Sequence, residues 1–160
     1  MKILVISDTH GRMYHLENLL YKQKNFDRIL HLGDIEGDEF YLRALVDCPV
    51  DIVGGNNDYQ YDMPREKIIK IEGHTIFMTH GHYYMVRYGI DRLLNVAMQK
   101  GAEIALFGHT HTPYLNEDLP VTLLNPGSIS LPRQENRLPS YAILETDEVG
   151  RLKASIHYIE

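Results

Sequence analysis

The feature that most constrains the fold of this chain is a recurring pattern of short apolar runs that end abruptly in polar residues. Five such runs end in Asp, Asn or His, and they cover residues 2–6, 28–32, 50–53, 75–78 and 103–107. A sixth run, 121–124, precedes Asn125-Pro126-Gly127-Ser128, a composition that predicts a turn. Near-continuous apolar strands bounded by Gly are typical of a sheet that is buried on both faces.

Apolar residues at helical spacing separate several of these strands. Residues 13–20 and, more weakly, 40–46 show this spacing, and residues 90–98 carry a full helical stripe that we expect to end near Gly101. Alternating strands and helices predict parallel strands joined by right-handed connections. Such strands place their carboxyl ends at one edge of the sheet, where open α/β sheets bind ligands.

Two hairpins complete the predicted elements. One covers residues 65–79 around Glu72-Gly73, and the other joins residues 141–146 to residues 152–158. Together the patterns predict an α/β fold, a mixed two-sheet β-sandwich flanked by helices, with its site at the carboxyl ends of the strands. A length of 160 residues is usual for one domain, so we expect residues 1–160 to form a single one.

Net charge and cysteine content limit the partners and the cellular compartment that we expect for this protein. With 16 Lys and Arg against 22 Asp and Glu, the net charge of −6 disfavours a nucleic-acid polymer as partner, because such binding needs a basic face. The single cysteine, Cys48, excludes an internal disulfide and fits a reducing compartment. No run resembles a signal peptide or a membrane span. We therefore expect a cytoplasmic protein with no membrane partner.

Polar residues with metal-binding chemistry gather at the predicted strand ends. They are Asp8, His10, Asp34, Asn56, His80, His109 and His111. Any one of them alone predicts a cap or a hydrogen-bonded core residue, but burying all of them together without a ligand would be costly. The mixed oxygen and nitrogen donors suit Mn, Fe, Co, Ni or Zn. Seven ligands are more than one tetrahedral ion can bind, but they suit two ions that share a carboxylate. Two such ions would attract a phosphate anion.

In order along the chain, these residues form the series D-x-H, G-D, G-N-x-D, H and G-H-x-H, which resembles the calcineurin-like metallophosphoesterase superfamily. The resemblance spans residues 3–133. The short chain, the His80-Gly81-His82 triplet and the Asn-Pro-Gly-Ser segment resemble its small YfcE-like phosphodiesterase branch. The resemblance implies hydrolysis of a small phosphate diester by in-line attack of a hydroxide that bridges two divalent ions.

The same resemblance implies a ligand set. One ion is expected on Asp8, His10, Asp34 and His111, and the other on Asp34, Asn56, His80 and His109, so that Asp34 bridges. Manganese is the first expectation, with Ni, Fe, Co, Zn or Mg as alternatives. Substrate contacts are implied for Asn56, Asn125, Ser128 and Arg133.

Three further residues are candidates for catalytic roles. Asp58 resembles a residue that orients a metal ligand or the Asn56 loop. In the protein phosphatases of the superfamily, a His general acid follows the metal-binding Asn, whereas this chain has Asn57, which lacks a useful pKa. We hypothesise that water or His82 protonates the leaving group instead, which predicts a preference for diesters with good leaving groups.

Other functions remain open from the sequence. The same site suits a phosphomonoesterase or a nuclease, and the same fold serves a non-catalytic retromer-like scaffold that binds protein. Retention of all seven candidate ligands favours catalysis over the scaffold.

Five tyrosines follow two of the strand ends that carry candidate ligands. They are Tyr59, Tyr61, Tyr83, Tyr84 and Tyr88. Three interpretations of these tyrosines are open. They could pack the loops, form a homo-oligomer interface, or line an aromatic wall for an aryl or nucleoside group. His31 lies inside an apolar run, and we expect it to be a core histidine with a hydrogen-bond partner.

Overall fold

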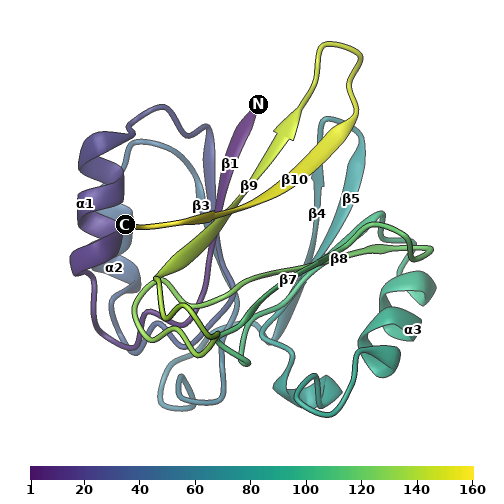
Figure 1. Ribbon diagram of the computed structural model, residues 1–160, viewed down its shortest axis with the longest axis horizontal. Helices are drawn as coiled ribbons and strands as arrows, with labels where there is room; N and C mark the ends of the chain where they lie inside the picture. Colours follow the sequence, from purple (N-terminus) through teal and green to yellow (C-terminus); the bar gives the residue numbers. More distant parts are fainter.

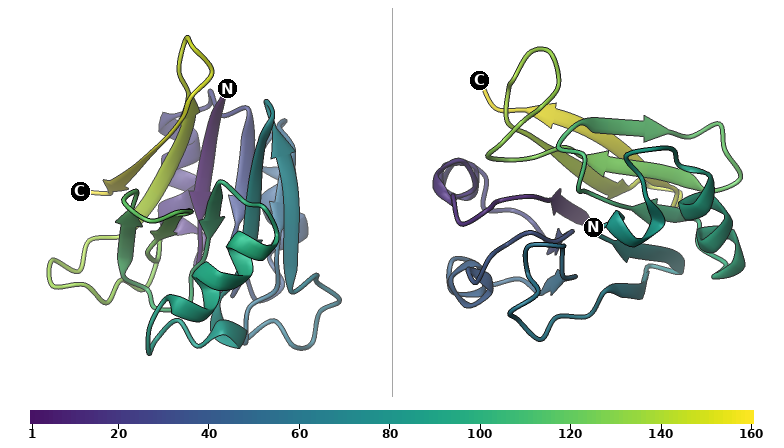
Figure 2. Two further views of the ribbon diagram at one scale, coloured as in Figure 1. Left: turned by 90° about the vertical axis from the view of Figure 1, so that its right-hand side faces the viewer. Right: turned by 90° about the horizontal axis from the view of Figure 1, so that it is seen from below.

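The computed structural model describes residues 1–160 and consists of two five-stranded sheets that pack face to face (Figure 1). The first sheet has the order β10-β9-β1-β2-β3 and the second the order β4-β5-β6-β8-β7. Helices α1 (Tyr14–Lys22) and α2 (Glu39–Ala44) cover the first sheet, and α3 (Asp91–Gln99) covers the second (Figure 2). The predicted mixed two-sheet fold is confirmed.

The strand bounds agree closely with the apolar runs. The first sheet contains β1 (Lys2–Ile6), β2 (Arg28–His31), β3 (Val50–Ile52), β9 (Ser140–Thr146) and β10 (Leu152–Tyr158). The second contains β4 (Glu66–Ile71), β5 (His74–Thr79), β6 (Ile104–Leu106), β7 (Pro113–Asn116) and β8 (Thr122–Pro126). Both predicted hairpins, β4–β5 and β9–β10, are present.

Parallel pairing brings the loops of the two sheets together at one edge. Strands β1, β2 and β3 are parallel to one another, and so are β5, β6 and β8. Within each sheet the loops after these strands are joined by backbone hydrogen bonds, from Asp8 to Gly33 (3.0 Å) and from Gly108 to His80 (3.0 Å). This edge carries the candidate site and lies at the bottom of the molecule in Figure 1.

The central strands are buried on both faces, as their composition predicts. In β1, Leu4 and Ile6 pack in the core beneath α1 and α2, while Ile3 and Val5 pack between the two sheets. All four side chains are fully buried. At about 25 cal/mol per Å² of apolar surface, each contributes roughly 1.5–3 kcal/mol. Burial on both faces leaves β1 rigid up to the point where its polar continuation begins.

Helix α3 ends as its sequence predicts. Gly101 has φ +66°, and its N–H donates to the carbonyl of Met98 while the N–H of Ala102 donates to that of Ala97. These two bonds form a Schellman motif, in which glycine relieves the strain of the left-handed residue.

The region after β6 differs from the prediction in two ways. Residues Asn125 and Pro126 extend β8 rather than forming a turn, and the chain turns only at Gly127, with φ +75°. Strand β7, which no apolar alternation predicts, pairs Tyr114 with Asn125 and Pro113 with Pro126. As the edge strand of its sheet, β7 tolerates a proline that cannot donate a ladder hydrogen bond.

No helix of the structure is both long enough and apolar enough to cross a membrane.

His31 is a core histidine with partners, which confirms its prediction. The ring is fully buried; its Nδ1 accepts a hydrogen bond from the N–H of Gly33 (3.1 Å), and its Nε2 lies 3.1 Å from Thr9 Oγ1. Because Nδ1 is an acceptor, the neutral ring carries its proton on Nε2 and donates to Thr9. Protonation of Nδ1 would break the bond to Gly33 and leave a buried charge.

We expect His31 to make folding sensitive to acid. Burial lowers the pKa of His31 from 6.5 to about 4, so between these values the unfolded chain binds a proton that the folded chain does not. Its contribution to stability is therefore complete above pH 6.5 and is lost as the pH falls towards 4. Urea unfolding should show a loss of about 2 kcal/mol from this residue between about pH 7.5 and about pH 5.

The variants His31→Gln and His15→Gln separate this effect from that of the other histidines. His31→Gln should flatten the pH dependence by that amount, whereas His15→Gln, at a half-buried position in α1, should keep it. Equal pH dependence in all three proteins would contradict the account.

Candidate metal centre

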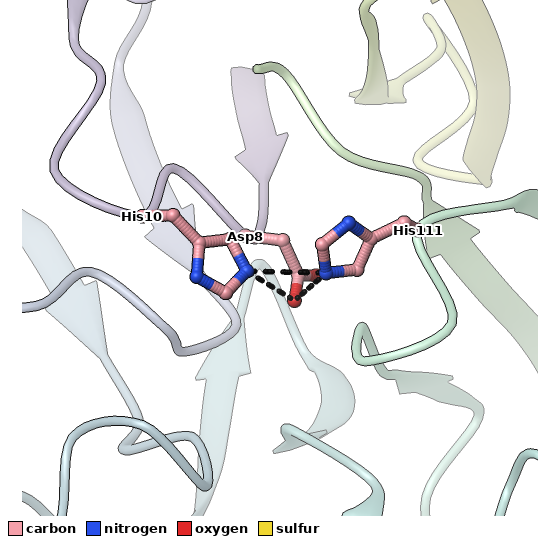
Figure 3. A group of neighbouring side chains, drawn as sticks. All are labelled: Asp8, His10 and His111. Carbon is pink, nitrogen blue, oxygen red and sulfur yellow. Dashed lines mark hydrogen bonds and ion pairs between the residues drawn. The ribbon is translucent and has the colours of Figure 1, made fainter. Parts of the chain in front are cut away.

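Asp8 follows β1 and presents one carboxylate oxygen that no donor satisfies. Its side chain is fully buried, and Oδ2 accepts hydrogen bonds from Ser7 Oγ (2.6 Å) and the backbone N–H of His109 (3.1 Å). Oδ1 has no hydrogen-bond partner, and it lies 3.1 Å from His111 Nε2 and 3.7 Å from His10 Nε2 (Figure 3). A buried carboxylate oxygen in this state requires a ligand or a proton to offset its desolvation.

Three imidazole rings are held so that their Nε2 atoms face this carboxylate. In each ring Nδ1 is engaged on the outer side, with His10 bonded to Glu36 Oε1 (2.6 Å), His80 to the carbonyl of Leu32 (2.7 Å) and His111 to that of Leu131 (2.7 Å). Carbonyl and carboxylate oxygens only accept, so Nδ1 carries a proton, and Nε2 is the atom that can bind a cation once the ring is neutral. Metal-binding histidines are typically oriented in this way.

The donor atoms form two overlapping groups. Asp8, His10 and His111 make up one, and Asp8, Asp34 and His80 make up the other, with donor atoms within 4.8 Å of one another. Asp34 Oδ2 lies 3.4 Å from His80 Nε2 and 3.6 Å from His10 Nε2. Asp8 therefore belongs to both groups, and Asp34 belongs to the second group but also faces His10 of the first. The resemblance implied that Asp34 alone is shared.

The backbone at these positions is unusual. Nine non-glycine residues have positive φ, and five of them are candidate ligands: Asp8, His10, Asp34, His109 and His111. A left-handed backbone costs a residue with a side chain roughly 1–2 kcal/mol, and such residues cluster at functional sites. The strain is concentrated where the seven candidate ligands lie.

Two glycines allow the loops to approach closely enough to form the centre. A Cβ atom on Gly55 would lie 2.1 Å from Asp34 Oδ1, and one on Gly108 would lie 2.0 Å from Ser7 Oγ. Any larger residue at either position would displace a side chain that orients or forms the centre.

The loop after β3 contacts Asp34 through successive residues. Asn57 donates its backbone N–H to Asp34 Oδ1 (2.8 Å) and its side-chain amide to Asp34 Oδ2 (2.8 Å). Asn56 Oδ1 lies 3.1 Å from His80 Nε2, at the rim of the second group. Asp58 is buried beneath this loop, where its carboxylate accepts backbone N–H groups of Asp34, Ile35, Glu36 and Gly55.

His109 and His82 lie next to the centre but outside both groups. The rings of His109 and His82 are centred 5.2 and 5.3 Å from that of His80. His109 contributes its backbone N–H to Asp8, while Nδ1 of His82 is buried without a partner. Both rings are half-buried.

The charges in the centre are strongly coupled. Burial raises the pKa of Asp8 and of Asp34, but nearby imidazoles outweigh it, hold the pKa of Asp8 well below its usual range and lower that of Asp34 to about 2. The neighbouring carboxylate of Asp8 raises the pKa of His10 to about 9. Burial, reinforced by His80, lowers the pKa of His109 to about 4. Ionised carboxylates beside imidazoles fit a divalent cation, whose binding would displace imidazole protons.

Two predicted substrate contacts do not fit the structure. Asn125 is fully buried; it donates to the Gly108 carbonyl (2.9 Å) and Thr110 Oγ1 (3.0 Å). Ser128 is also fully buried and donates to the Asp8 carbonyl (2.8 Å). Both residues hold loops that carry candidate ligands, and neither exposes surface that a substrate could contact.

Arg133 remains a prediction. It is exposed near the centre, where its backbone N–H donates to the carbonyl of His111 (3.0 Å).

Three residues that orient the centre were not predicted from the sequence. Glu36 binds His10 Nδ1, Ser7 donates to Asp8 Oδ2, and Ser130 Oγ lies 2.9 Å from the Asp8 carbonyl. The only indication of these residues in the sequence is that they lie close to Asp34, Asp8 and Ser128.

Comparison with known proteins agrees with this geometry. The chain matches the calcineurin-like phosphoesterase superfamily domain over residues 1–149. It is 33% identical over 152 residues to a probable metallophosphoesterase of Methanothermobacter thermautotrophicus, covering 92% of this chain and 87% of that protein. It is 27% identical over 172 residues to the phosphodiesterase YfcE of Escherichia coli K12, covering 92% of this chain and 89% of YfcE.

Solved structures share the fold over almost the whole chain. A predicted phosphoesterase of Streptococcus pneumoniae has a TM-score of 0.83 at 29% identity, covering 98% of this chain and 88% of that one. Wild-type Vps29 of Entamoeba histolytica in complex with Zn²⁺ has a TM-score of 0.77 at 26% identity, covering 99% of each chain. The family match, the relatives and the strand-end carboxylates and imidazoles lead to one conclusion: this chain belongs to the calcineurin-like phosphoesterase superfamily.

Proposed function

We propose that this protein is a dinuclear metal-dependent phosphodiesterase that hydrolyses a small phosphate diester. The observation that carries the proposal is the buried Asp8 Oδ1, which lacks a donor and lies 3.1 Å from His111 Nε2, 3.7 Å from His10 Nε2 and 3.9 Å from His80 Nε2. The name of the relative YfcE supports the diesterase activity. Manganese remains our first choice of metal because it suits carboxylate ligands, while the imidazoles keep Ni, Fe, Co and Zn as alternatives.

In this proposal the protein residues bind, orient and move protons. If bound, two divalent ions would supply Lewis-acid chemistry, lowering the pKa of a water and offsetting negative charge on the phosphate. Asp8 and Asp34 would contribute the negative charge that holds such ions. The other proposed ligands are His10, His80, His111, Asn56 and His109.

Protonation of the leaving group needs a residue other than Asn57. The Asn57 amide already donates to Asp34 Oδ2 (2.8 Å) and has no proton to release at neutral pH. We propose water or His82 for this step. Burial, followed by the charge of His80, lowers the pKa of His82, which makes its protonated form a stronger acid. A weak supply of protons favours diesters with good leaving groups.

Several properties belong to the proposal as well. We propose that residues 1–160 act as one domain in the cytoplasm, in keeping with the free thiol of Cys48. The tyrosine-rich loops leave homo-oligomerisation as an alternative, and the chemistry of the site leaves a monoesterase or a nuclease as alternatives to the diesterase.

The decisive experiment combines metal analysis with turnover. Purified protein is stripped of metal and titrated with Mn²⁺, Ni²⁺, Zn²⁺ or Mg²⁺, and hydrolysis of bis(4-nitrophenyl) phosphate and 4-nitrophenyl phosphate is measured in parallel. We expect two bound ions per chain and turnover of the diester above that of the monoester. Asn57→His should raise turnover of diesters with poor leaving groups; unchanged turnover would contradict the proton-supply account.

One observation favours a second candidate, a non-catalytic protein-binding scaffold. The similar Vps29 structure is a complex with Zn²⁺, so metal binding alone cannot separate an enzyme from a scaffold. Two bound ions with no turnover of any phosphoester would favour the scaffold.

A further inference from the structure

A cleft opens beside the candidate centre, with a volume of about 440 Å³. Its lining includes Asn56, Tyr59, Tyr61, Arg65, His82 and Tyr83. Asn56 Oδ1 lies 3.1 Å from His80 Nε2, so the cleft lies directly beside the candidate ligands. Sites for small molecules usually occupy about 300–1,000 Å³, and a phosphate group alone needs far less than this cleft offers.

Arg65 places an unpaired positive charge in this cleft. Its guanidinium carbon lies 4.5 Å from the centre of the Tyr83 ring. None of the ion pairs or side-chain hydrogen bonds in the structure involves the Arg65 guanidinium, although the chain carries a net charge of −6. Contact with an aromatic face leaves the N–H groups at the guanidinium edge free to bind an anion in a bidentate manner. Arg65 is therefore held in place and lacks an anionic partner.

We propose that this cleft binds the alcohol portion of the substrate, and that Arg65 selects alcohols that carry a second anionic group. The inference rests on the proposed phosphodiesterase function and adds a substrate class to it. The phosphate would lie at the candidate metal centre, the exposed tyrosines would flank the middle of the alcohol, and the carboxylate or phosphate at its far end would meet Arg65. A charge-assisted bidentate contact of this kind improves recognition by about tenfold at an exposed site.

A matched pair of substrates tests the proposal. Both are 4-nitrophenyl phosphodiesters; the second alcohol is 4-carboxybenzyl alcohol in one and the isosteric, uncharged 4-carbamoylbenzyl alcohol in the other. The metal-loaded full chain should prefer the carboxylate by about tenfold in kcat/KM, mainly through KM. This preference should fall to about one in Arg65→Gln and take an intermediate value in Arg65→Lys, which keeps the charge but loses the planar fork.

A control variant removes the same charge far from the cleft. Arg151→Gln changes the turn between β9 and β10, at the opposite end of the molecule from the strand-end loops (Figure 1). It should retain the preference of the wild-type protein. A preference that is equal in wild type and Arg65→Gln, or that falls equally in Arg151→Gln, overturns the proposal. A 4-phosphonobenzyl analogue extends the test to a dianion, and a ratio near one for both anions likewise overturns it.

Binding of the corresponding monoesters separates this inference from the proposed function. Calorimetry compares 4-carboxybenzyl phosphate with 4-carbamoylbenzyl phosphate on metal-loaded wild type and Arg65→Gln. If no diester is hydrolysed, the proposed function fails, yet about tenfold tighter binding of the carboxylate by wild type alone still supports the cleft as an anion-selective site. Equal binding of the two monoesters overturns it whether or not the protein is an enzyme.

Discussion

Replacing Asp34 by Asn is expected to lower turnover of a phosphodiester by at least about 10³-fold and to remove one of the two bound ions. Asp34 Oδ2 lies within 3.4 Å of His80 Nε2 and 3.6 Å of His10 Nε2, so a single carboxylate faces both ligand groups. Asn keeps the size of the side chain but removes the negative charge. It also places an amide group where Asn57 now donates two hydrogen bonds. Turnover and metal content per chain are the measurements.

Thermal stability gives a second readout that does not depend on turnover. A ligand present at about 1,000 times its dissociation constant stabilises the folded state by about 4 kcal/mol, so metal should raise the melting temperature of the wild-type protein. Asp34→Asn should lose most of this rise. The matched control is Asp118→Asn, which removes an exposed carboxylate outside the strand-end loops. A metal content and rate equal to wild type in Asp34→Asn would contradict the ligand assignment.

The fold could be predicted because its signal is local. Ile3, Leu4, Val5 and Ile6 alternate between two cores, and a strand buried on both sides must be apolar throughout. The polar residue that ends such a strand lies at a sheet edge, and parallel pairing brings these edges together. The candidate ligands were therefore visible as residue types at strand ends.

Partners formed in three dimensions could not be predicted. The amide of Asn125 is used by Gly108 and Thr110, 17 and 15 residues away, so the sequence shows only a polar residue before a proline. Glu36 reaches His10 from a loop 26 residues away and has positive φ, a conformation that its residue type does not indicate. Strand β7 forms on pairing with β8 rather than on alternation of its own residues. In each case tertiary contacts decide the outcome.

Substitution of Asp58 tests whether the metal centre depends on a residue whose side chain contacts no candidate ligand side chain. Its carboxylate, 2% exposed, accepts backbone N–H groups of Asp34 (2.6 Å), Gly55 (2.8 Å) and Glu36 (2.7 Å), with Ile35 at 3.3 Å. Asp58→Ala leaves these donors without an acceptor, and we expect unfolding free energy to fall by about 3–4 kcal/mol. The loops carrying Asp34 and Asn56 would separate, so metal affinity should fall by about 10–100-fold.

The control for Asp58 must lose stability without disturbing the loops. Asp51, in β3, pairs with Arg28 (2.8 Å) and Lys67 (2.9 Å), and neither partner reaches the centre. Asp51→Ala should lower the unfolding free energy by about 1 kcal/mol, because ion pairs that remain partly accessible to water contribute little. Metal affinity should stay unchanged. Metal titration is carried out where both variants are fully folded by circular dichroism. Wild-type affinity in Asp58→Ala, or an equal loss in Asp51→Ala, would show that the carboxylate supports the fold and does not position the ligands.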